Sequence, residues 1–423
     1  MNIQEMIKDS VDELAHRLPP RPDLADHALR QARRHTRAVR LAVAGGAALA
    51  VASATVITST DLLKSADFNA PVLGSGQSDA GETEVTIALD ELPTGELPMV
   101  PWFADGALHV GGNDTLFDVD VRYLNGLLRV EDGYFASVTP NAAGDHEAPL
   151  YLVPDDGTPT MLADGWVPDV IAGPGNLVAW SGGRWDTKFA GEETTTTLTV
   201  ADATTGDVLH ERQAPLGRDT SVVGFLDENR VLVSAADNSD QGVYVWDLAA
   251  DTIHPWMDGY DGATALTSSG GIGAFVADGD DGTMTTAVVD TATDEVLWTT
   301  TNRLSAHAFS PDGRFAVFFD APSPDDLREA EAAGDQPSTY PRRELVVVET
   351  QSGDEVARFD AEHAERFAWE PDGSLVFEAW QDSSQMALVR CSLDGDCELA
   401  TEPRATNVHP DAAQPPYHLG DNY

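Results

Sequence analysis

The segment Leu198-Thr-Val-Ala-Asp-Ala-Thr-Thr-Gly206 combines an apolar strand pattern with a tight-turn sequence. The same pattern recurs five more times. The related segments are Leu150-Tyr-Leu-Val-Pro-Asp-Asp-Gly157, Val243-Tyr-Val-Trp-Asp-Leu-Ala-Ala-Asp251, Ala287-Val-Val-Asp-Thr-Ala-Thr-Asp294, Leu345-Val-Val-Val-Glu-Thr-Gln-Ser-Gly353 and Leu388-Val-Arg-Cys-Ser-Leu-Asp-Gly395. Successive turns lie 42 to 59 residues apart. A repeat of roughly 40–50 residues with several strands in each unit is typical of a β-propeller.

A second kind of turn divides each repeat. Ser310-Pro-Asp-Gly313 and Glu370-Pro-Asp-Gly373 are its clearest examples, because proline and glycine preset the turn dihedrals. Apolar runs such as Leu375–Trp380 follow these turns and are expected to be central strands. The pattern predicts an all-β fold of seven blades, with six as the alternative because the first blade has the weakest pattern. The predicted blades cover residues 84–120, 121–163, 165–214, 218–258, 261–302, 304–360 and 364–402.

The first and last strands of the ring are less clear from the sequence. Residues 84–89 alternate between polar and apolar side chains, which predicts a strand. We expect this strand to be the outer strand of the first blade, so that an N-terminal strand closes the ring. The stretch 403–423 is rich in proline, aspartate and asparagine, and it is predicted to be a mobile tail.

An uncharged segment, LAVAGGAALAVASATVITS at 41–59, is long enough to cross a bilayer as one helix. Arginines crowd residues 30–40 just before it, which favours a cytoplasmic N-terminus and an extracytoplasmic main domain. A signal peptide cleaved after Ala54 is the alternative, although its charged region would be unusually long. The sequence therefore predicts a single-pass protein of the plasma membrane.

The parts around that helix also have distinct compositions. Residues 1–40 are predicted to be a cytoplasmic helical segment, whose apolar stripe either contacts a partner or the inner leaflet, or belongs to a solvated helix. Residues 60–82 are polar and small, which indicates a linker. The propeller itself is expected over residues 83–402.

The chain is strongly acidic, with 71 acidic and 25 basic residues and a net charge of −46. A field of this sign repels nucleic acid, which is therefore not expected as a partner. The acidity fits either a solubilising surface or a face that binds cations. Asp278-Gly-Asp280-Asp281-Gly282 resembles the start of a calcium loop, but the twelfth position is Val289 where such a loop needs glutamate. No metal site and no cofactor is predicted.

The two cysteines, Cys391 and Cys397, flank a turn between two short apolar runs. In a hairpin they could face each other across the strands, close enough for a disulfide. An exported chain favours that bond, and two free buried thiols are the alternative.

The Ser-Pro-Asp-Gly turns, the Val-x-Asp-x-x-Thr-Gly hairpins and Tyr244-Val-Trp246-Asp247-Leu resemble those of WD-repeat and TolB-like β-propellers. The Gly-His pair and regular Trp-Asp of the strict WD-repeat are missing from most blades, so the looser TolB-like class fits better. The arginine-rich leader, single weak membrane helix and acidic propeller together resemble uncharacterised single-pass membrane proteins of actinobacteria. The resemblance implies a binding platform rather than a particular chemistry.

Two predicted loops break the regular repeat, at 181–196 in blade three and 321–343 in blade six. Long loops on one face of a scaffold are where binding residues concentrate. Aromatic and basic side chains are scarce in this domain, so those in the two loops are the candidate contact residues for a ligand or partner. They are Trp185, Lys188, Phe189, Tyr340, Arg342 and Arg343. The alternative is that the aromatic members only pack their own loops.

No nucleophile elbow, zinc-protease motif or phosphate-binding loop is present in the sequence, so no catalytic residue is predicted. The sequence favours a membrane-anchored extracytoplasmic propeller that binds a protein or a small ligand in the cell envelope. One alternative is a transmembrane signalling protein whose first 40 residues engage a cytoplasmic regulator. The other is a propeller-type envelope hydrolase or lyase, which would need convergent carboxylates beside a tyrosine or arginine in the central channel.

Overall fold

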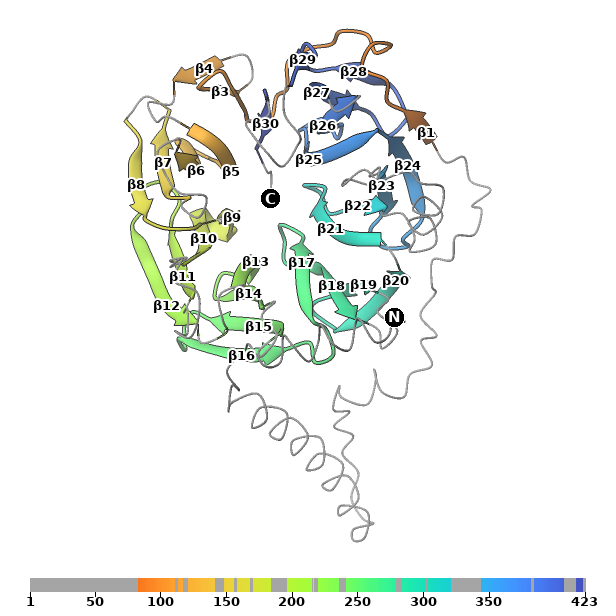
Figure 1. The fold of residues 1–423 in the computed structure, drawn as a ribbon. Coiled ribbons are helices and arrows are strands. Elements are labelled where there is room, and N and C mark those ends of the chain that lie inside the picture. The colour runs from red at the N-terminus through yellow and green to blue at the C-terminus, as the bar shows by residue number, and fades with distance from the viewer. Residues whose placement is uncertain are drawn as a thin grey trace, which may run out of the picture. The chain divides into compact units, whose positions relative to one another are not determined.

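The computed structural model describes most of the chain from residue 83 onward. The described ranges are 83–110, 113–116, 121–140, 148–155, 158–167, 170–183, 196–214, 216, 220–235, 241–278, 284–301, 303–320, 344–381, 384–406 and 416–420. These residues form seven sheets, almost entirely antiparallel, arranged around a central axis (Figure 1). The chain is therefore a seven-bladed β-propeller, and the six-bladed alternative is wrong.

Four blades consist of four strands that follow one another in the chain. Blade two contains β5 (Val121–Val130), β6 (Gly133–Pro140), β7 (Leu150–Pro154) and β8 (Thr160–Ala163). Blade three contains β9 (Val170–Ala172), the short 3-10 turn Pro174–Asn176, β10 (Leu177–Gly182), β11 (Thr196–Asp202) and β12 (Val208–Ala214). Blade four contains β13 (Thr220–Asp227), β14 (Arg230–Ala235), β15 (Gly242–Asp247) and β16 (Thr252–Trp256). Blade five contains β17 (Gly262–Leu266), β18 (Ile272–Asp278), β19 (Met284–Asp290) and β20 (Glu295–Thr301).

The other three blades include strands from the ends of the described chain. Blade six contains β21 (Arg303–Phe309), β22 (Phe315–Asp320), β23 (Glu344–Glu349), β24 (Glu355–Asp360) and β1 (Thr83–Thr86). Blade seven contains β25 (His363–Trp369), β26 (Leu375–Gln381), β27 (Gln385–Cys391), β28 (Cys397–Leu399) and β29 (Arg404–Ala405). Blade one contains β30 (His418–Leu419), β2 (Trp102–Ala104), β3 (Ala107–Val110) and β4 (Asn113–Leu116). The predicted limits of blades two to five contain these strands, whereas blade six also includes β1 and blade seven also includes β29, both of which lie outside the predicted limits.

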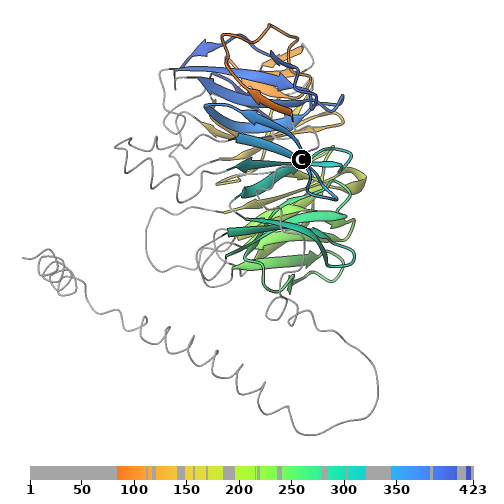
Figure 2. The same cartoon turned by 90° about the vertical axis from the view of Figure 1, so that its right-hand side faces the viewer.

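Alternating strand direction gives the ring two distinct faces, seen edge on in Figure 2. The turns between first and second strands and between third and fourth strands lie on one face, which we call the turn face. The connections between second and third strands, and those from blade to blade, lie on the opposite face, which we call the connection face.

The core consists of the second and third strands of each blade, which neighbouring blades cover on both sides. In β14, Val231, Leu232 and Val233 are fully buried, and they belong to two different clusters. Val231 and Val233 pack toward blade three, whereas Leu232 packs toward blade five. This explains why these strands are continuous apolar runs rather than alternating ones, as the sequence predicted.

The position of the first strand differs from the prediction. β1 pairs in parallel with β24, the outer strand of blade six, with Thr83 opposite Ala357 and Thr86 opposite Asp360. Ile87 and Leu89, which follow it, are buried in the cluster that blades six and seven share. The prediction that 84–89 forms the outer strand of blade one is therefore wrong, because alternation identifies a strand but not its partner.

The C-terminal stretch also differs from the prediction of a mobile tail at 403–423. β29 pairs with β27, and β30 pairs with β2 as the innermost strand of blade one (Figure 1). Tyr417 and Leu419 are almost completely buried. The tail prediction is wrong for these residues, and a C-terminal strand, instead of an N-terminal one, closes the ring.

Within the described ranges, no helix is long and apolar enough to span a membrane. The predicted leader at 1–40, membrane helix at 41–59 and linker at 60–82 all lie outside those ranges.

Candidate functional site

The six predicted contact residues lie in the two predicted loops at 181–196 and 321–343. The structure fixes the ends of both segments, because β10 ends at Gly182 and β11 begins at Thr196, while β22 ends at Asp320 and β23 begins at Glu344. Each segment joins a second strand to a third strand, so both leave and re-enter the ring on the connection face. Trp185, Lys188, Phe189, Tyr340, Arg342 and Arg343 themselves lie outside the described residues.

The inner strands of the ring include a group of ionisable residues where the ring closes. The register of β25 with β26 passes from Ala364 opposite Ala379 to Phe367 opposite Phe377. Glu365 and Arg366 therefore form a bulge opposite Glu378. A bulge of this kind re-aims side chains away from the regular alternation of a strand.

Glu378 and Arg366 each form a hydrogen bond with the backbone of a neighbouring part of the ring. The Glu378 side chain is buried, and its Oε1 accepts a hydrogen bond of 2.8 Å from the backbone N–H of Leu419 in β30. Arg366 Nη1 donates a hydrogen bond of 2.6 Å to the carbonyl oxygen of Leu124 in β5. Blade seven is thereby joined to the closing strand and to blade two.

The histidine of the closing strand lies beside these two residues. His418 is buried, and burial together with the positive charge of Arg366 lowers the pKa of its imidazole to about 3. A histidine with this pKa is neutral at physiological pH and cannot act as an acid or base near pH 7. We call Arg366, Glu378 and His418 the closing cluster. Its geometry indicates a structural role, because Arg366 and Glu378 both form hydrogen bonds with backbone groups of other blades.

At two other junctions between blades, a serine on the second strand forms a hydrogen bond with the backbone next to it in the following blade. Ser234 in β14 accepts a hydrogen bond of 3.1 Å from the backbone N–H of Ala263, the next blade's first strand. Ser137 in β6 donates one to the carbonyl oxygen of Val167, which precedes blade three. The glutamate at the closing junction is thus the longer version of a repeated contact.

Many carboxylates of the turn face belong to residues that form the turns. Asp202 Oδ1 accepts hydrogen bonds of 2.9 and 3.0 Å from the backbone N–H groups of Thr204 and Thr205, and Asp290 makes equivalent bonds with Ala292 and Thr293. These bonds, chiefly those from Thr205 and Thr293, hold the pKa of both carboxyl groups below the ordinary value. The main role of these aspartates is therefore to form the turns.

Two acidic turns, Asp155-Asp156-Gly157 and the one beginning at Asp278 that resembles a calcium loop, are only partly described. Asp155 pairs with Arg129, with 2.9 Å between Arg129 Nη2 and Asp155 Oδ2, while Asp156 and Gly157 lie outside the described residues. Asp278 ends β18, and residues 279–282 of that turn also lie outside them. Among the described residues, no group of three or more histidine, cysteine, aspartate or glutamate side chains is placed to hold a metal ion.

A buried ion network occupies the turn face between blades seven and one. Arg390 in β27 donates to Glu370 Oε2 at 2.6 Å and to Glu398 Oε1 at 2.6 Å. Its guanidinium also donates to the carbonyl oxygens of Glu96 and Leu97, each at 3.0 Å. Glu370 Oε1 accepts a hydrogen bond of 2.6 Å from the backbone N–H of Met99. The hydrogen bond with Glu370 is the largest of the effects that raise the pKa of Arg390, so its charge is retained.

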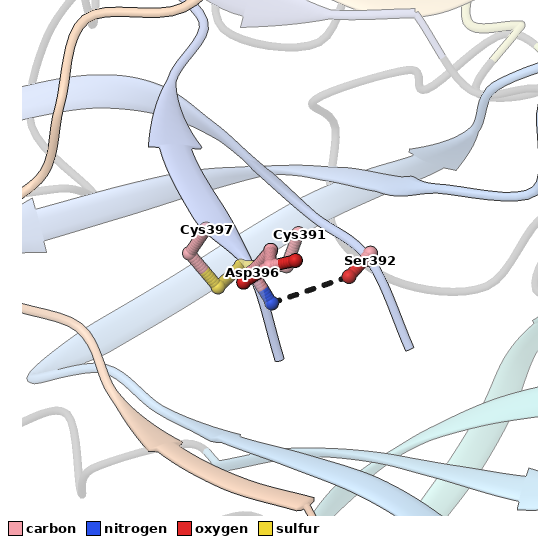
Figure 3. The surroundings of a disulfide bond; sticks show 4 residues. All are labelled: Cys391, Ser392, Asp396 and Cys397. Carbon is pink, nitrogen blue, oxygen red and sulfur yellow. Dashed lines mark hydrogen bonds between the residues drawn. A yellow bond between two sulfur atoms is a disulfide. The ribbon is translucent and has the colours of Figure 1, made fainter. Parts of the chain in front are cut away.

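The predicted disulfide is present beside this network. Cys391 and Cys397 face each other across β27 and β28 with 4.2 Å between their Cα atoms, and their sulfur atoms are bonded (Figure 3). In the turn that they enclose, the backbone N–H of Asp396 donates to Ser392 Oγ at 3.2 Å. The neighbouring cross-strand pair is Arg390 and Glu398. The hairpin prediction for Cys391 and Cys397 is confirmed.

Sequence reasoning missed the closing cluster and the Arg390 network. The contacts of both groups join distant parts of the chain. The turn Glu370-Pro-Asp-Gly373 was a local signal for a turn, but it does not show that the Glu370 side chain is buried against Arg390.

No protein-family description matches this sequence, and no curated protein matches it as a relative. Many solved structures are similar in fold. Hydrazine synthase of Kuenenia stuttgartiensis is 13% identical over 66% of this chain and 80% of its own, with a TM-score of 0.45. The Dos1 propeller is 11% identical over 70% and 73%, with a TM-score of 0.42. The Cps50 (Swd1) β-propeller domain of Myceliophteria_thermophila is 10% identical over 69% and 98%, with a TM-score of 0.39.

These likenesses concern the propeller alone, since their identities and TM-scores are low. The seven sheets make the described chain a seven-bladed β-propeller.

Proposed function

We propose that this protein is a binding platform of the cell envelope, anchored by one membrane helix at 41–59 with its propeller outside the cell and its N-terminus in the cytoplasm. The platform binds a protein or small ligand through its connection face. The resemblance to TolB-like propellers and to membrane proteins of actinobacteria is part of this proposal.

One observation carries the proposal. In a closed ring, all loops that join a second strand to a third strand lie on the same face, and the two enlarged loops at 181–196 and 321–343 are both of this kind. The ring gives those loops a rigid base, which is the arrangement that binding scaffolds use. The candidate contacts in the loops are the aromatic and basic residues Trp185, Lys188, Phe189, Tyr340, Arg342 and Arg343. Propellers commonly bind other proteins, so a protein is the first partner to seek.

The disulfide supports the placement outside the cytoplasm. Disulfides persist in oxidising compartments and are rare where glutathione keeps thiols reduced. Cys391 and Cys397 are bonded in the folded hairpin, which fits a propeller that matures after export.

The test is in-cell crosslinking followed by capture of the full-length chain from its native membranes. Two block variants carry alanine, one at Trp185, Lys188 and Phe189 and the other at Tyr340, Arg342 and Arg343. We expect at least one block to lower the yield of a crosslinked partner by about tenfold, whereas the exposed control Met161→Ala leaves it unchanged. Protease added outside intact cells should digest the propeller and spare the leader.

Two outcomes would reject the proposal. A propeller that stays protected from external protease contradicts its location. A partner whose yield is unaffected by both block variants contradicts the connection face as the binding surface. A signalling protein, by contrast, would lose its function when residues 1–30 are deleted while its anchor and external partner remain.

A further inference from the structure

Two large apolar side chains are exposed together on the turn face. Leu97 and Met99 are 53% and 54% exposed, and they alternate with buried Pro98 and Val100. This alternation places Leu97 and Met99 on the outer side of the segment that leads into β2. We call these two side chains the Leu97–Met99 patch.

The backbone beneath the patch is firmly held. Arg390 donates to the carbonyl oxygens of Glu96 and Leu97, and Glu370 accepts from the N–H of Met99. The Glu370 side chain is 1% exposed and that of Arg390 is 12% exposed. Burying such charges costs desolvation free energy, which their mutual pairing offsets. An apolar pair on a backbone held this way loses little conformational entropy when a partner binds.

The surroundings of the patch are negatively charged. The Arg390 guanidinium is balanced by two carboxylates, Glu370 and Glu398. Glu96 within the segment and Asp372 in the adjoining turn are both exposed, so four carboxylates surround the single guanidinium of Arg390. A partner that approaches the patch therefore meets an excess of negative charge around two apolar side chains, and positive charge on the partner is complementary.

We infer that the Leu97–Met99 patch binds a cationic segment of another protein, with apolar side chains packed on Leu97 and Met99 and lysine or arginine facing Glu96, Asp372 and Glu398. This inference rests on the proposed function and names a class of partner and a second surface for it. The surface is on the opposite face from the two enlarged loops.

The test measures binding of a fluorescent amphipathic helical peptide of leucine and lysine to the full-length chain in detergent. The patch variant is Leu97→Ser with Met99→Ser. The matched control is Val208→Ser with Leu209→Ser, an equally exposed apolar pair on the outer strand of blade three. We expect the patch variant to weaken binding by about tenfold and the control to leave it unchanged. A lysine and serine peptide of equal charge should bind wild type about tenfold more weakly.

Three results would overturn the inference. They are equal losses in both double variants, no preference for the leucine-containing peptide, and a wild-type dimer in light scattering that the patch variant abolishes. The last would assign the patch to a second copy of the chain. Circular dichroism and the urea midpoint check that both variants fold.

The crosslinking experiment separates this inference from the proposed function. If wild type captures a cationic protein and the patch variant captures it equally well, the inference fails while the platform stands. If wild type captures no partner at all, the proposed function fails.

Discussion

A single buried carboxylate, Glu378, is central to how the ring closes. Its side chain accepts a hydrogen bond from the N–H of Leu419, as Ser234 does from the N–H of Ala263 at another junction between blades. A glutamate side chain reaches further than a serine side chain. Substituting Glu378→Ala leaves that buried N–H without its acceptor, which costs about 1–3 kcal/mol. We expect the free energy of unfolding to fall by that amount, measured from urea denaturation followed by tryptophan fluorescence.

Glu378→Gln provides the comparison at the same position, because an amide keeps an oxygen that can accept the Leu419 N–H. Its unfolding free energy should stay closer to that of wild type than that of the alanine variant. Exposed Glu228→Ala is the background control. If Glu378→Ala were as stable as Glu228→Ala, the hydrogen bond to Leu419 would contribute nothing to closure.

At the scale of one element, the β27–β28 hairpin carries the disulfide and the Arg390 network side by side. Cys391–Cys397 is adjacent to the pair Arg390–Glu398 in the same register. Removing the bond with Cys391→Ser and Cys397→Ser should lower the free energy of unfolding by about 2–3 kcal/mol, because a short loop is then unrestrained in the unfolded chain. A reducing agent should shift the urea midpoint of wild type and leave the double variant unchanged. Equal midpoints without reductant would contradict a stabilising role.

The elements differ in how far sequence could predict them. Hairpins such as β19–β20 were predictable because their strands, turn residues and partner lie within a few positions of one another. β1 and β30 were not, since the partner of β1 is β24, more than two hundred residues away. β30 is only two residues long, and nothing in His418-Leu419 distinguishes it from a tail.

For the whole molecule, the candidate sites also differ in whether nearby or distant parts of the sequence form them. The enlarged loops were found because they interrupt a regular repeat, which is a local signal. The closing cluster and the Leu97–Met99 patch depend on which blades meet when the ring closes. Arg390 shows this well, because its carboxylate partners are close in sequence while the carbonyls it holds belong to Glu96 and Leu97. No spacing rule connects positions so far apart.

Closure of the whole ring depends on a small number of residues in and around β30. β30 pairs with β2, Gly420 N–H donates to Pro101 at 2.9 Å, and Tyr417 Oη donates to the carbonyl oxygen of Glu402 at 2.7 Å. Deleting residues 416–423 removes these contacts, leaves the inner edge of β2 unpaired and uncovers the buried core around Trp102. We expect loss of the cooperative urea transition, or a midpoint far below that of wild type.

Two further variants keep this prediction testable if the deletion prevents folding. Leu419→Ala removes a side chain that is 1% exposed and should cost about 2–5 kcal/mol in unfolding free energy. Deleting only residues 421–423 keeps the described contacts of the closing strand and should leave the midpoint unchanged. If Leu419→Ala unfolded at the wild-type midpoint, the C-terminal strand would contribute little to holding the ring closed.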